Sequence, residues 1–259
     1  MPELPDLEVF SRNLSKALKS KRLENIGIAN AGKARVSEKE LNEVLVGKKL
    51  RDVTRVGKQL CFDFGKDARL FMHLMLHGRL VIQRSDADPP KHTLASLNFG
   101  AEALYLTDYQ KAAHLLLNPE AGDAVDALSE ELDGDWLAEK FSGSRAKVKT
   151  LLMDQKVIAG IGNAYADEIL WEAKIDPESV AGKIPANVVN ALSKAIGKVL
   201  RDAEKKILKE NPDIISGEVR DFLKIHNSKK EKSPGGAAIL SKSVGGRKTY
   251  FTEEQKRYQ

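Results

Sequence analysis

Two adjacent residues at the start of the chain, Pro2 and Glu3, have side chains and positions suited to covalent chemistry. Initiator methionine is usually removed when the next residue is small, so we expect Pro2 to become the mature N-terminus. An α-amino group has a pKa of ~8, so part of this secondary amine is unprotonated near neutral pH. Such an amine attacks an electrophilic sugar carbon and forms an iminium, while Glu3 donates or accepts a proton. The alternative is structural, with Pro2 a rigid start and Glu3 and Asp6 complementing a helix dipole.

A second candidate is the glycine-containing run 157–168, in which Gly160 and Gly162 precede Asn163. Glycines let the backbone approach a partner closely, and Asn163 can cap a following helix. A helix N-terminus behind such a turn is a ready anion site, because its free N–H groups and the helix dipole favour negative charge. The alternative is a tight turn between two packed helices. The spacing matches neither a Walker nor a dinucleotide-binding motif.

Two basic residues follow glycines at predicted turns. Lys58 comes directly after Gly57 at the start of a strand-like run, and Arg247 comes directly after Gly245-Gly246 at the tip of a predicted hairpin. Both side chains are suited to a phosphate, and a guanidinium can bind one with two parallel hydrogen bonds. The alternative for each is an exposed, solvated charge.

Metal and disulfide chemistry receive no support from the sequence. The chain has one cysteine, Cys61, which excludes an intrachain disulfide and any zinc site built from several thiolates. His73 and His77 lie four residues apart in a strand-like run, where they are separated by ~13 Å and cannot share a metal ion. We therefore expect no metal and no cofactor.

Charge is distributed unevenly along the chain. The 42 Lys and Arg residues exceed the 37 Asp and Glu residues, for a net charge of +5 and a pI of about 9.1. The segment 224–259 holds nine basic and three acidic residues, so the rest of the chain is close to neutral. A basic C-terminal segment predicts contact with a polyanion, and a solubilising tail is the alternative.

The composition is that of an ordinary globular protein, with 42% hydrophobic and 31% charged residues in 259. This excludes a wholly disordered chain and predicts one large or two modest domains. No apolar run approaches the ~20 residues that cross a bilayer, and the N-terminus lacks a secretory signal. We therefore expect a cytosolic protein with no membrane association.

Apolar periodicity divides the chain into a strand-rich and a helical part. A helix is predicted from Asp6 to Lys19, and period-two alternation predicts strands over Leu60–Phe64, Leu70–Leu76, Ala95–Phe99 and from Leu104. Strands this close together, broken by glycines, indicate an antiparallel sandwich or barrel.

Helical spacing then dominates, with helices predicted near 148–152, 164–173 and 188–207, before a hairpin that turns at Gly245-Gly246. The predicted organisation has four parts: a β domain over 1–132, a hinge or linker over 133–141, a helical domain over 142–223 and a basic hairpin over 224–259.

The order of these motifs resembles the formamidopyrimidine-DNA glycosylase/endonuclease VIII family, and the resemblance runs nearly from end to end. It rests on Pro2-Glu3-Leu4-Pro5, Lys58, Ile161–Ala166 and Gly246–Phe251. It implies an α+β fold, with an N-terminal antiparallel β-sandwich that carries an N-terminal helix. A C-terminal helix–two-turn–helix domain with a β-hairpin finger would follow.

The resemblance also implies a role for each matching residue. Pro2 resembles the nucleophile that attacks the anomeric carbon of a damaged nucleotide, and Glu3 the acid that protonates the sugar ring oxygen. Lys58 resembles the lysine that holds a phosphate and assists elimination. Asn163 resembles the asparagine on the phosphate beside the lesion, and Arg247 the arginine at the finger tip.

The implied activity is that of a bifunctional DNA glycosylase and abasic-site lyase of base excision repair. Such an enzyme removes oxidised or ring-opened bases through a Schiff base and cleaves the strand by β,δ-elimination, acting on a nucleotide flipped out of the stack. Its partner would be damaged double-stranded DNA, with single strands an alternative, and the enzyme a monomer in the bacterial cytoplasm or a eukaryotic nucleus. A non-catalytic damaged-DNA-binding protein and a lyase restricted to abasic sites are the alternatives.

The chain departs from the family in the finger and in the residues that fill the gap in DNA. Four zinc-binding cysteines are usual in the finger, whereas Thr252–Gln255 follow Tyr250-Phe251 here, so the sequence predicts a zincless finger held by side-chain packing. Where the family has Thr-Asp-Pro-Arg-Arg-Phe, this chain has Thr107–Ala112.

In that run Ala112 replaces the aromatic wedge, and Gln110 replaces the arginine that reads the opposite base. Leu76 still matches the other intercalating position, and His92 and Arg145 fall near DNA-contact positions.

Overall fold

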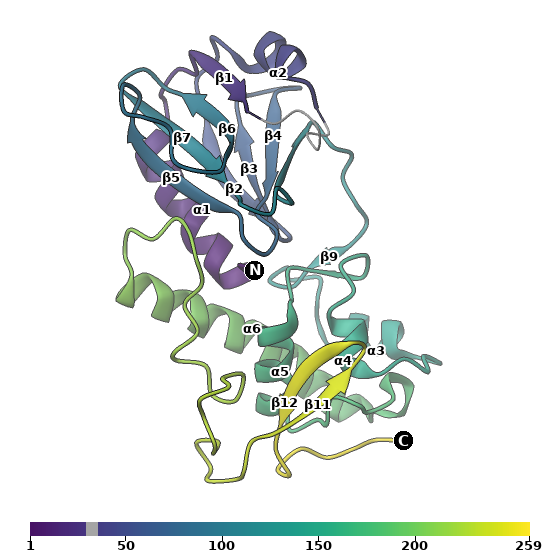
Figure 1. The fold of residues 1–259 in the computed structure, drawn as a ribbon. Helices are drawn as coiled ribbons and strands as arrows, with labels where there is room; N and C mark the ends of the chain where they lie inside the picture. The colour runs from purple at the N-terminus through teal and green to yellow at the C-terminus, as the bar shows by residue number, and fades with distance from the viewer. Residues whose placement is uncertain (30–35) are drawn as a thin grey trace. The chain divides into compact units, whose positions relative to one another are not determined.

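The computed structural model describes residues 1–29 and 36–259, which form two compact units (Figure 1). The first unit comprises residues 1–121 together with 207–218, and the second comprises 122–206 together with 219–259. The finer division into four parts stays a prediction.

The first unit is an antiparallel β-sandwich with two helices (Figure 1). One sheet has the strand order β1-β6-β7-β5, and the other has the order β2-β3-β4-β8. Their elements are α1 (Leu4–Leu18), β1 (Asn25–Ile28), α2 (Glu38–Leu45), β2 (Asp52–Val56), β3 (Gln59–Asp63), β4 (Arg69–His73), β5 (Arg79–Arg84), β6 (Thr93–Asn98), β7 (Glu102–Thr107) and β8 (His114–Leu117). The predicted sandwich with an N-terminal helix is confirmed.

The core of this unit lies between the two sheets and under α1. Leu60 and Phe62 of β3 and Leu104 of β7 are fully buried, as their period-two spacing predicts. Phe10 and Leu14 of α1 join the same core, and α1 packs against β2. Burial of each such side chain contributes about 1.5–3 kcal/mol, so this cluster holds the sandwich together.

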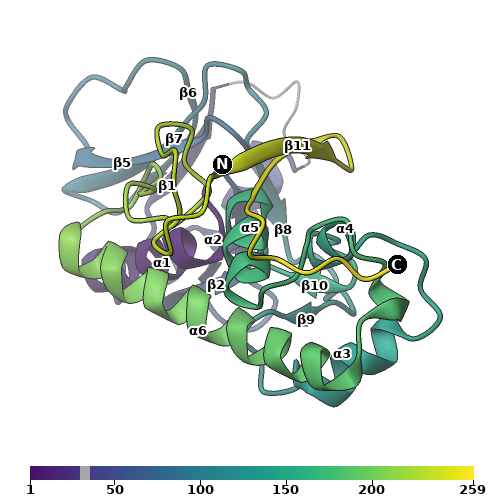
Figure 2. The same ribbon diagram turned by 90° about the horizontal axis from the view of Figure 1, so that it is seen from below.

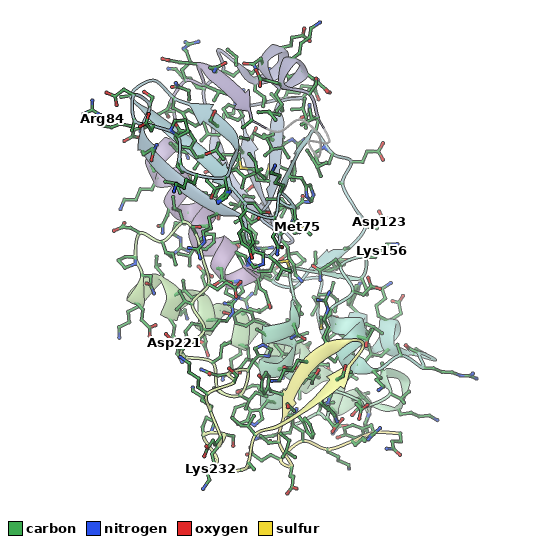
Figure 3. The ribbon with its side chains drawn as sticks, in the orientation of Figure 1. Met75, Arg84, Asp123, Lys156, Asp221 and Lys232 are labelled. Carbon is green, nitrogen blue, oxygen red and sulfur yellow. The ribbon has the colours of Figure 1, made fainter. Side chains whose placement is uncertain are left out.

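The strand predicted over Leu70–Leu76 is too long, because β4 ends at His73 and a tight turn follows. In that turn the N–H of Gly78 donates to the carbonyl of Leu74 at 2.8 Å, and Met75, labelled in Figure 3, has a φ of 52°. A Cβ atom on Gly78 would lie 2.2 Å from the Leu74 carbonyl oxygen, a distance that real contacts do not reach. The turn therefore requires glycine at position 78.

Replacing Gly78 with alanine tests this requirement. We expect Gly78→Ala to lower the free energy of unfolding by about 1–3 kcal/mol, because the backbone must shift to relieve the clash. Gly122→Ala is the matched control, since an added Cβ there meets no atom within 4 Å. Denaturant unfolding of both variants measures the difference, and equal stabilities would contradict the assignment.

The second unit is mainly helical and ends in a hairpin (Figure 2). Its elements are β9 (Val125–Asp126), α3 (Gly134–Phe141), α4 (Val148–Leu152), β10 (Ile158–Ala159), α5 (Asn163–Glu172), the 3-10 helix η2 (Ala181–Lys183), α6 (Ala186–Glu210, whose last residues belong to the first unit), β11 (Leu240–Val244) and β12 (Arg247–Phe251). The three predicted helices correspond to α4, α5 and α6. No helix among the described residues combines the length and apolar character needed to cross a membrane.

The stretch 133–141, predicted as a hinge or linker, contains the helix α3, and its role between the domains stays a prediction. Asp133 is the N-cap of that helix, and its side chain accepts a hydrogen bond from the N–H of Trp136 at 2.8 Å. Asp-Gly-Asp is typical of turns, but an aspartate before apolar residues at helical spacing is equally typical of a helix start. Burial of Leu137 and Phe141 decides for the helix.

The C-terminal hairpin has the predicted glycine turn. Strands β11 and β12 pair from Leu240 opposite Phe251 to Val244 opposite Arg247. Gly245 has a φ of 57° and the following glycine a φ of 74°. Two successive positive φ values are typical of the two-residue turns that match the twist of a hairpin, and glycine adopts them without strain.

A hydrogen-bonded carboxylate holds the base of this hairpin. Glu254 Oε2 accepts hydrogen bonds from Ser233 Oγ at 2.8 Å, Trp171 Nε1 at 3.0 Å and Thr252 Oγ1 at 3.1 Å. Its Oε1 accepts one from Lys174 Nζ at 3.0 Å. These bonds, led by that from Ser233, lower the pKa of Glu254 to about 2. One side chain thus links the hairpin to α5 and to the loop before β11.

The neighbouring glutamine completes this arrangement. Gln255 Oε1 accepts the N–H of Thr252 at 2.8 Å, while its Nε2 donates to the carbonyl of Ile175 at 2.8 Å. Thr252 and Gln255 are both buried. In the described residues of this finger, polar side chains make the cross-links between its loops.

The pH dependence of stability tests the role of Glu254. Because its pKa falls from 4.5 to about 2 on folding, the ionised carboxylate stabilises the finger above the higher value. This contribution is lost as the pH falls from 4.5 to about 2. We therefore expect Glu254→Gln to be destabilising near neutral pH and its deficit to shrink across that interval.

Urea unfolding followed by the fluorescence of Trp171 measures the stability of the finger. Because the chain has two tryptophans, the experiment uses a Trp136→Phe background so that only Trp171 is observed. Glu253→Gln, an exposed neighbour, is the matched control. A deficit that stays constant down to pH 2 would overturn the role given to Glu254.

Candidate active site

The first unit contains an open pocket of about 700 Å³, a size that accommodates a nucleotide. Five short segments line it: Met1-Pro2, the turn 76–79, Lys91-His92, the loop 107–109 and residues 217–218. Three predicted site residues, Pro2, Leu76 and His92, therefore share one pocket.

Pro2 is held in place by the start of α1. Glu3 is the N-cap residue, and it forms a reciprocal capping box with Asp6, whose Oδ2 accepts the Glu3 N–H at 2.9 Å. Glu3 is 5% exposed and Asp6 fully buried. Both acids thus have the structural role weighed for them, and that role fixes the backbone immediately after Pro2.

The N-terminal ammonium group lies in this pocket. In the described chain it belongs to Met1 and forms an ion pair with Glu218. The nitrogen of Pro2 is part of a peptide bond as long as Met1 is attached. A carboxylate from a segment over 200 positions away in sequence thus lies within contact distance of the N-terminus.

Basic side chains surround the pocket. Arg79, Lys91 and His92 are exposed along its wall. His92 has a φ of 62°, and its carbonyl accepts the N–H of Asp108 at 3.0 Å, which fixes the position of the loop that carries it. The exposed cations Arg79 and Lys91 in the wall of a nucleotide-sized pocket favour an anionic ligand such as a phosphate backbone.

Asp108 organises the loop after β7. Its Oδ1 accepts the N–H of Gln110 at 2.9 Å, and its Oδ2 accepts those of Ala112 at 2.8 Å and Ala113 at 2.9 Å. Burial by itself would raise the pKa of Asp108, but these backbone donors outweigh it and the pKa is lowered. The carboxylate therefore holds the loop closed in its ionised form.

Three predicted residues of the same unit, Glu3, Lys58 and Gln110, lie outside the described lining of this pocket. Lys58 is half-buried in the two-residue turn between β2 and β3, and Gln110 is exposed in the loop after β7. Their roles toward DNA stay predictions.

In the second unit, Asn163 does not cap α5, which corrects that expectation. Gly162 occupies the N-cap position, and Asn163 is the first helical residue. The Nδ2 of Asn163 donates to the carbonyl of Lys248 at 2.9 Å, while its buried Oδ1 has no hydrogen-bond partner among the described residues. Asn163 thereby ties the start of α5 to β12.

The two predicted arginines of this unit are both exposed. Arg247 is the first residue of β12, directly after the glycine turn, and Arg145 lies in the loop between α3 and α4. Their positions leave both side chains open to a ligand.

A buried ion pair, which the sequence did not reveal, holds β12 against α5. Lys149 Nζ lies 2.7 Å from Asp167 Oδ1, and both residues are 1% exposed. Lys149 also donates to Thr249 Oγ1 at 2.7 Å, and Asp167 Oδ2 accepts the N–H of Tyr250 at 2.9 Å. His226 Nδ1 lies 2.7 Å from the same carboxylate oxygen. The sequence feature that could have revealed this pair is helical spacing, which places Lys149 and Asp167 on the buried faces of their helices.

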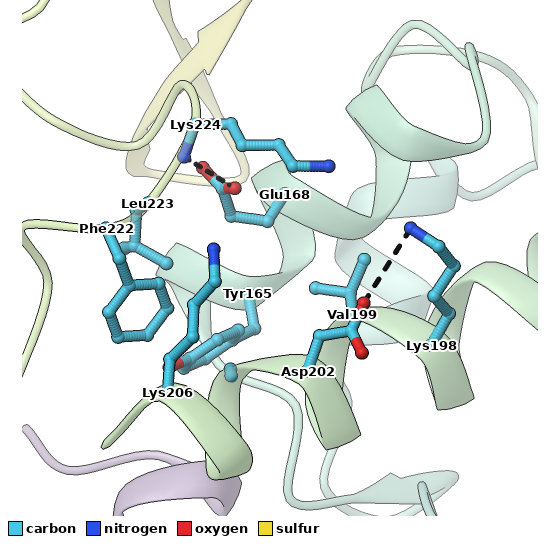
Figure 4. A pocket seen from close by; sticks show the side chains of 10 residues that line it. Tyr165, Glu168, Lys198, Val199, Asp202, Lys206, Phe222, Leu223 and Lys224 are labelled. Carbon is cyan, nitrogen blue, oxygen red and sulfur yellow. Dashed lines mark hydrogen bonds and ion pairs between the residues drawn. The ribbon is translucent and has the colours of Figure 1, made fainter. Parts of the chain in front are cut away.

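The second unit has a small pocket of its own, between α5, α6 and the loop at Phe222 (Figure 4). Its volume of about 60 Å³ is too small for a nucleotide. Within residues 1–29 and 36–259, no group of three or more His, Cys, Asp or Glu side chains is arranged to hold a metal ion.

Family models match both parts of the chain. Residues 1–115 match the formamidopyrimidine-DNA glycosylase N-terminal domain, and residues 124–210 match the formamidopyrimidine-DNA glycosylase H2TH domain. The formamidopyrimidine-DNA glycosylase of Pelotomaculum thermopropionicum is 31% identical, and that of Lactococcus lactis subsp. cremoris 29%. Each alignment covers 97% of both chains.

Solved structures agree with these matches. The Lactococcus lactis protein in complex with DNA containing an abasic site is 27% identical, with a TM-score of 0.87. A non-covalent complex of that enzyme with such DNA is 28% identical, with a TM-score of 0.88. Both cover 99% of this chain and 100% of theirs. The chain therefore belongs to the formamidopyrimidine-DNA glycosylase family, whose members are DNA glycosylases of base excision repair that also have abasic-site lyase activity.

Proposed function

We propose that this chain excises oxidised or ring-opened bases from DNA and cleaves the strand at the resulting site, with the amine of Pro2 as nucleophile. The observation that carries the proposal is the position of Pro2 in the wall of a nucleotide-sized pocket rimmed by basic side chains. The capping box behind Pro2 supports it, because a nucleophile is effective only when its approach to the substrate is fixed.

The proposed reaction forms and breaks bonds in a defined order. The Pro2 nitrogen bonds to C1′ of the flipped nucleotide, and the base leaves with the electron pair of the glycosidic bond. The base takes up the proton that the Pro2 nitrogen loses, so the lone pair of that nitrogen is free for the next step. Glu3 protonates the sugar ring oxygen, the ring opens, and the nitrogen lone pair forms the iminium. The iminium acidifies C2′, so loss of its proton expels the 3′ phosphate, and a second elimination expels the 5′ phosphate.

Removal of Met1 is a requirement of this mechanism, because an amide nitrogen is not a nucleophile. Glu218 lies at the present N-terminus, so removal would leave a carboxylate close to the new amine. We assign no cofactor to the reaction, because each proposed step uses only the amine of Pro2, the acid Glu3 and the phosphates as leaving groups.

The DNA is bound, in this proposal, through phosphate contacts from Lys58, Asn163 and Arg247, with Arg145 and the basic segment 224–259 adding attraction. The preferred substrate is damaged double-stranded DNA, and the enzyme acts as a monomer. The solved relatives bound to abasic-site DNA support this choice of substrate.

Borohydride trapping tests the nucleophile. The wild-type protein is first checked by mass spectrometry for the absence of Met1. With borohydride and EDTA present, it should then form a covalent adduct with an abasic-site duplex. Pro2→Gly should lose most of this adduct, because the secondary amine that forms the iminium is replaced. Glu3→Gln should slow release of a damaged base by about 10²-fold, since general acid catalysis is lost.

Each outcome of this experiment has a separate meaning. Full adduct formation by Pro2→Gly would contradict the assignment of the nucleophile. No adduct with wild-type protein would favour a non-catalytic binding protein, and adduct formation only on preformed abasic sites would favour a lyase restricted to them.

Salt dependence of binding tests the finger. Arg247→Ala should weaken binding to every DNA sequence alike and reduce the slope of log K against log salt by about 1, because phosphate contacts carry no base information. Arg84→Ala is the matched control, because Arg84 is also exposed but pairs with Asp86 on β5 and its following turn. Equal slopes in both variants would count against a phosphate contact by Arg247.

A further inference from the structure

We propose that Tyr109, packed on His77 beside Leu76, is the aromatic side chain that stacks on DNA bases at the gap left by the flipped nucleotide. This inference rests on the proposed function and adds a residue to it. The aromatic wedge that Ala112 lacks would then be supplied three positions earlier in the same loop.

Leu76 and Tyr109 are both exposed at the pocket. Leu76 is 60% exposed and Tyr109 57% exposed, and both line the pocket that contains Pro2. A free protein gains nothing by leaving two large apolar side chains in water at one site, and such a patch commonly marks a binding surface. The remaining exposed large apolar residues of the described chain, Val56 and Leu240, do not line this pocket.

The two side chains lie at the same end of one sheet. Strands β5 and β7 pair with Arg79 opposite Thr107, so the turn before β5 and the loop after β7 meet at the same end of the sheet. The ring of His77 lies 4.8 Å from that of Tyr109, at an interplanar angle of 44°. The hydroxyl of Tyr109 accepts a hydrogen bond from Gln110 Nε2 at 3.4 Å.

Backbone hydrogen bonds hold the turn that carries Leu76 and the loop that carries Tyr109. The close approach of Gly78 to the Leu74 carbonyl holds the first turn, and the three backbone bonds to Asp108 hold the second. An aromatic ring that is already ordered loses little entropy on binding, so its stacking energy is retained as affinity.

Ala112 cannot take this role, because its N–H is bound by Asp108 and its side chain is a single methyl group. Tyr109, by contrast, is a large aromatic side chain with more than half of its surface exposed. Nucleic-acid bases are the partner that fits, because base–aromatic stacking tolerates any sequence and the basic residues Arg79, Lys91 and His92 attract the flanking phosphates.

The test uses a duplex with a tetrahydrofuran abasic-site analogue and 2-aminopurine as the opposite base. Binding of wild-type protein should change the 2-aminopurine fluorescence, because the ring contacts the unpaired base. Tyr109→Ala should bind this duplex about 5- to 100-fold more weakly and lose most of the fluorescence change, and Tyr109→Phe should restore both. Trp136→Ala, which removes a partly exposed aromatic side chain of α3 outside the pocket, should behave as wild type.

Borohydride trapping at saturating abasic-site DNA separates this inference from the proposed function. Tyr109→Ala should still form the adduct, because the ring does not take part in the covalent step, and its thermal unfolding should match wild type. Affinity and fluorescence equal to wild type in Tyr109→Ala would overturn the stacking role even if the adduct forms. Loss of the adduct in wild-type protein with a normal fluorescence response would overturn the Pro2 chemistry alone.

Discussion

The position of the N-terminus is the constraint on which the site depends. Chain ends are usually poorly ordered unless other contacts hold them. Here α1 begins at Leu4, its capping box uses Glu3 and Asp6, and its apolar face is buried in the sandwich core. The backbone that follows Pro2 is therefore fixed at the pocket wall. In the proposed mechanism this placement is what makes the amine of Pro2 effective, since a positioned nucleophile reacts faster than a free one.

The finger shows how polar side chains can do the work of structural cross-links. Glu254 and Gln255 connect the loops on either side of the hairpin, and the buried pair of Lys149 and Asp167 fastens β12 to α5. A buried ion pair stabilises only when its partners are well satisfied, and removal of one partner leaves a costly charge. Lys149 donates a hydrogen bond to Thr249, and Asp167 accepts one from the N–H of Tyr250, so this condition is met and the network fixes β12 against α5.

The pocket in the first unit brings the proposed nucleophile and the proposed stacking side chain to one end of a sheet. The paired strands β5 and β7 present Leu76 and Tyr109 on turns that are closed by Gly78 and Asp108. Apolar surface, aromatic rings and cations are therefore held together with the N-terminus. This combination suits a ligand with flat apolar faces and a charged backbone.

Apolar periodicity predicted the strand-rich part, the N-terminal helix, the three helices that correspond to α4, α5 and α6, and the glycine turn of the hairpin, because these features depend on local spacing. The order of the motifs gave the resemblance to the family, and that resemblance implied the sandwich. The tertiary structure decided which distant segments lie together. It places Glu218 against the N-terminus and the ring of Tyr109 against that of His77. The helix at 134–141 and the commitment of Asn163 to Lys248 were likewise outside the reach of local patterns. The physical reason is that burial and long-range hydrogen bonds select among conformations that local propensity leaves nearly equal in energy.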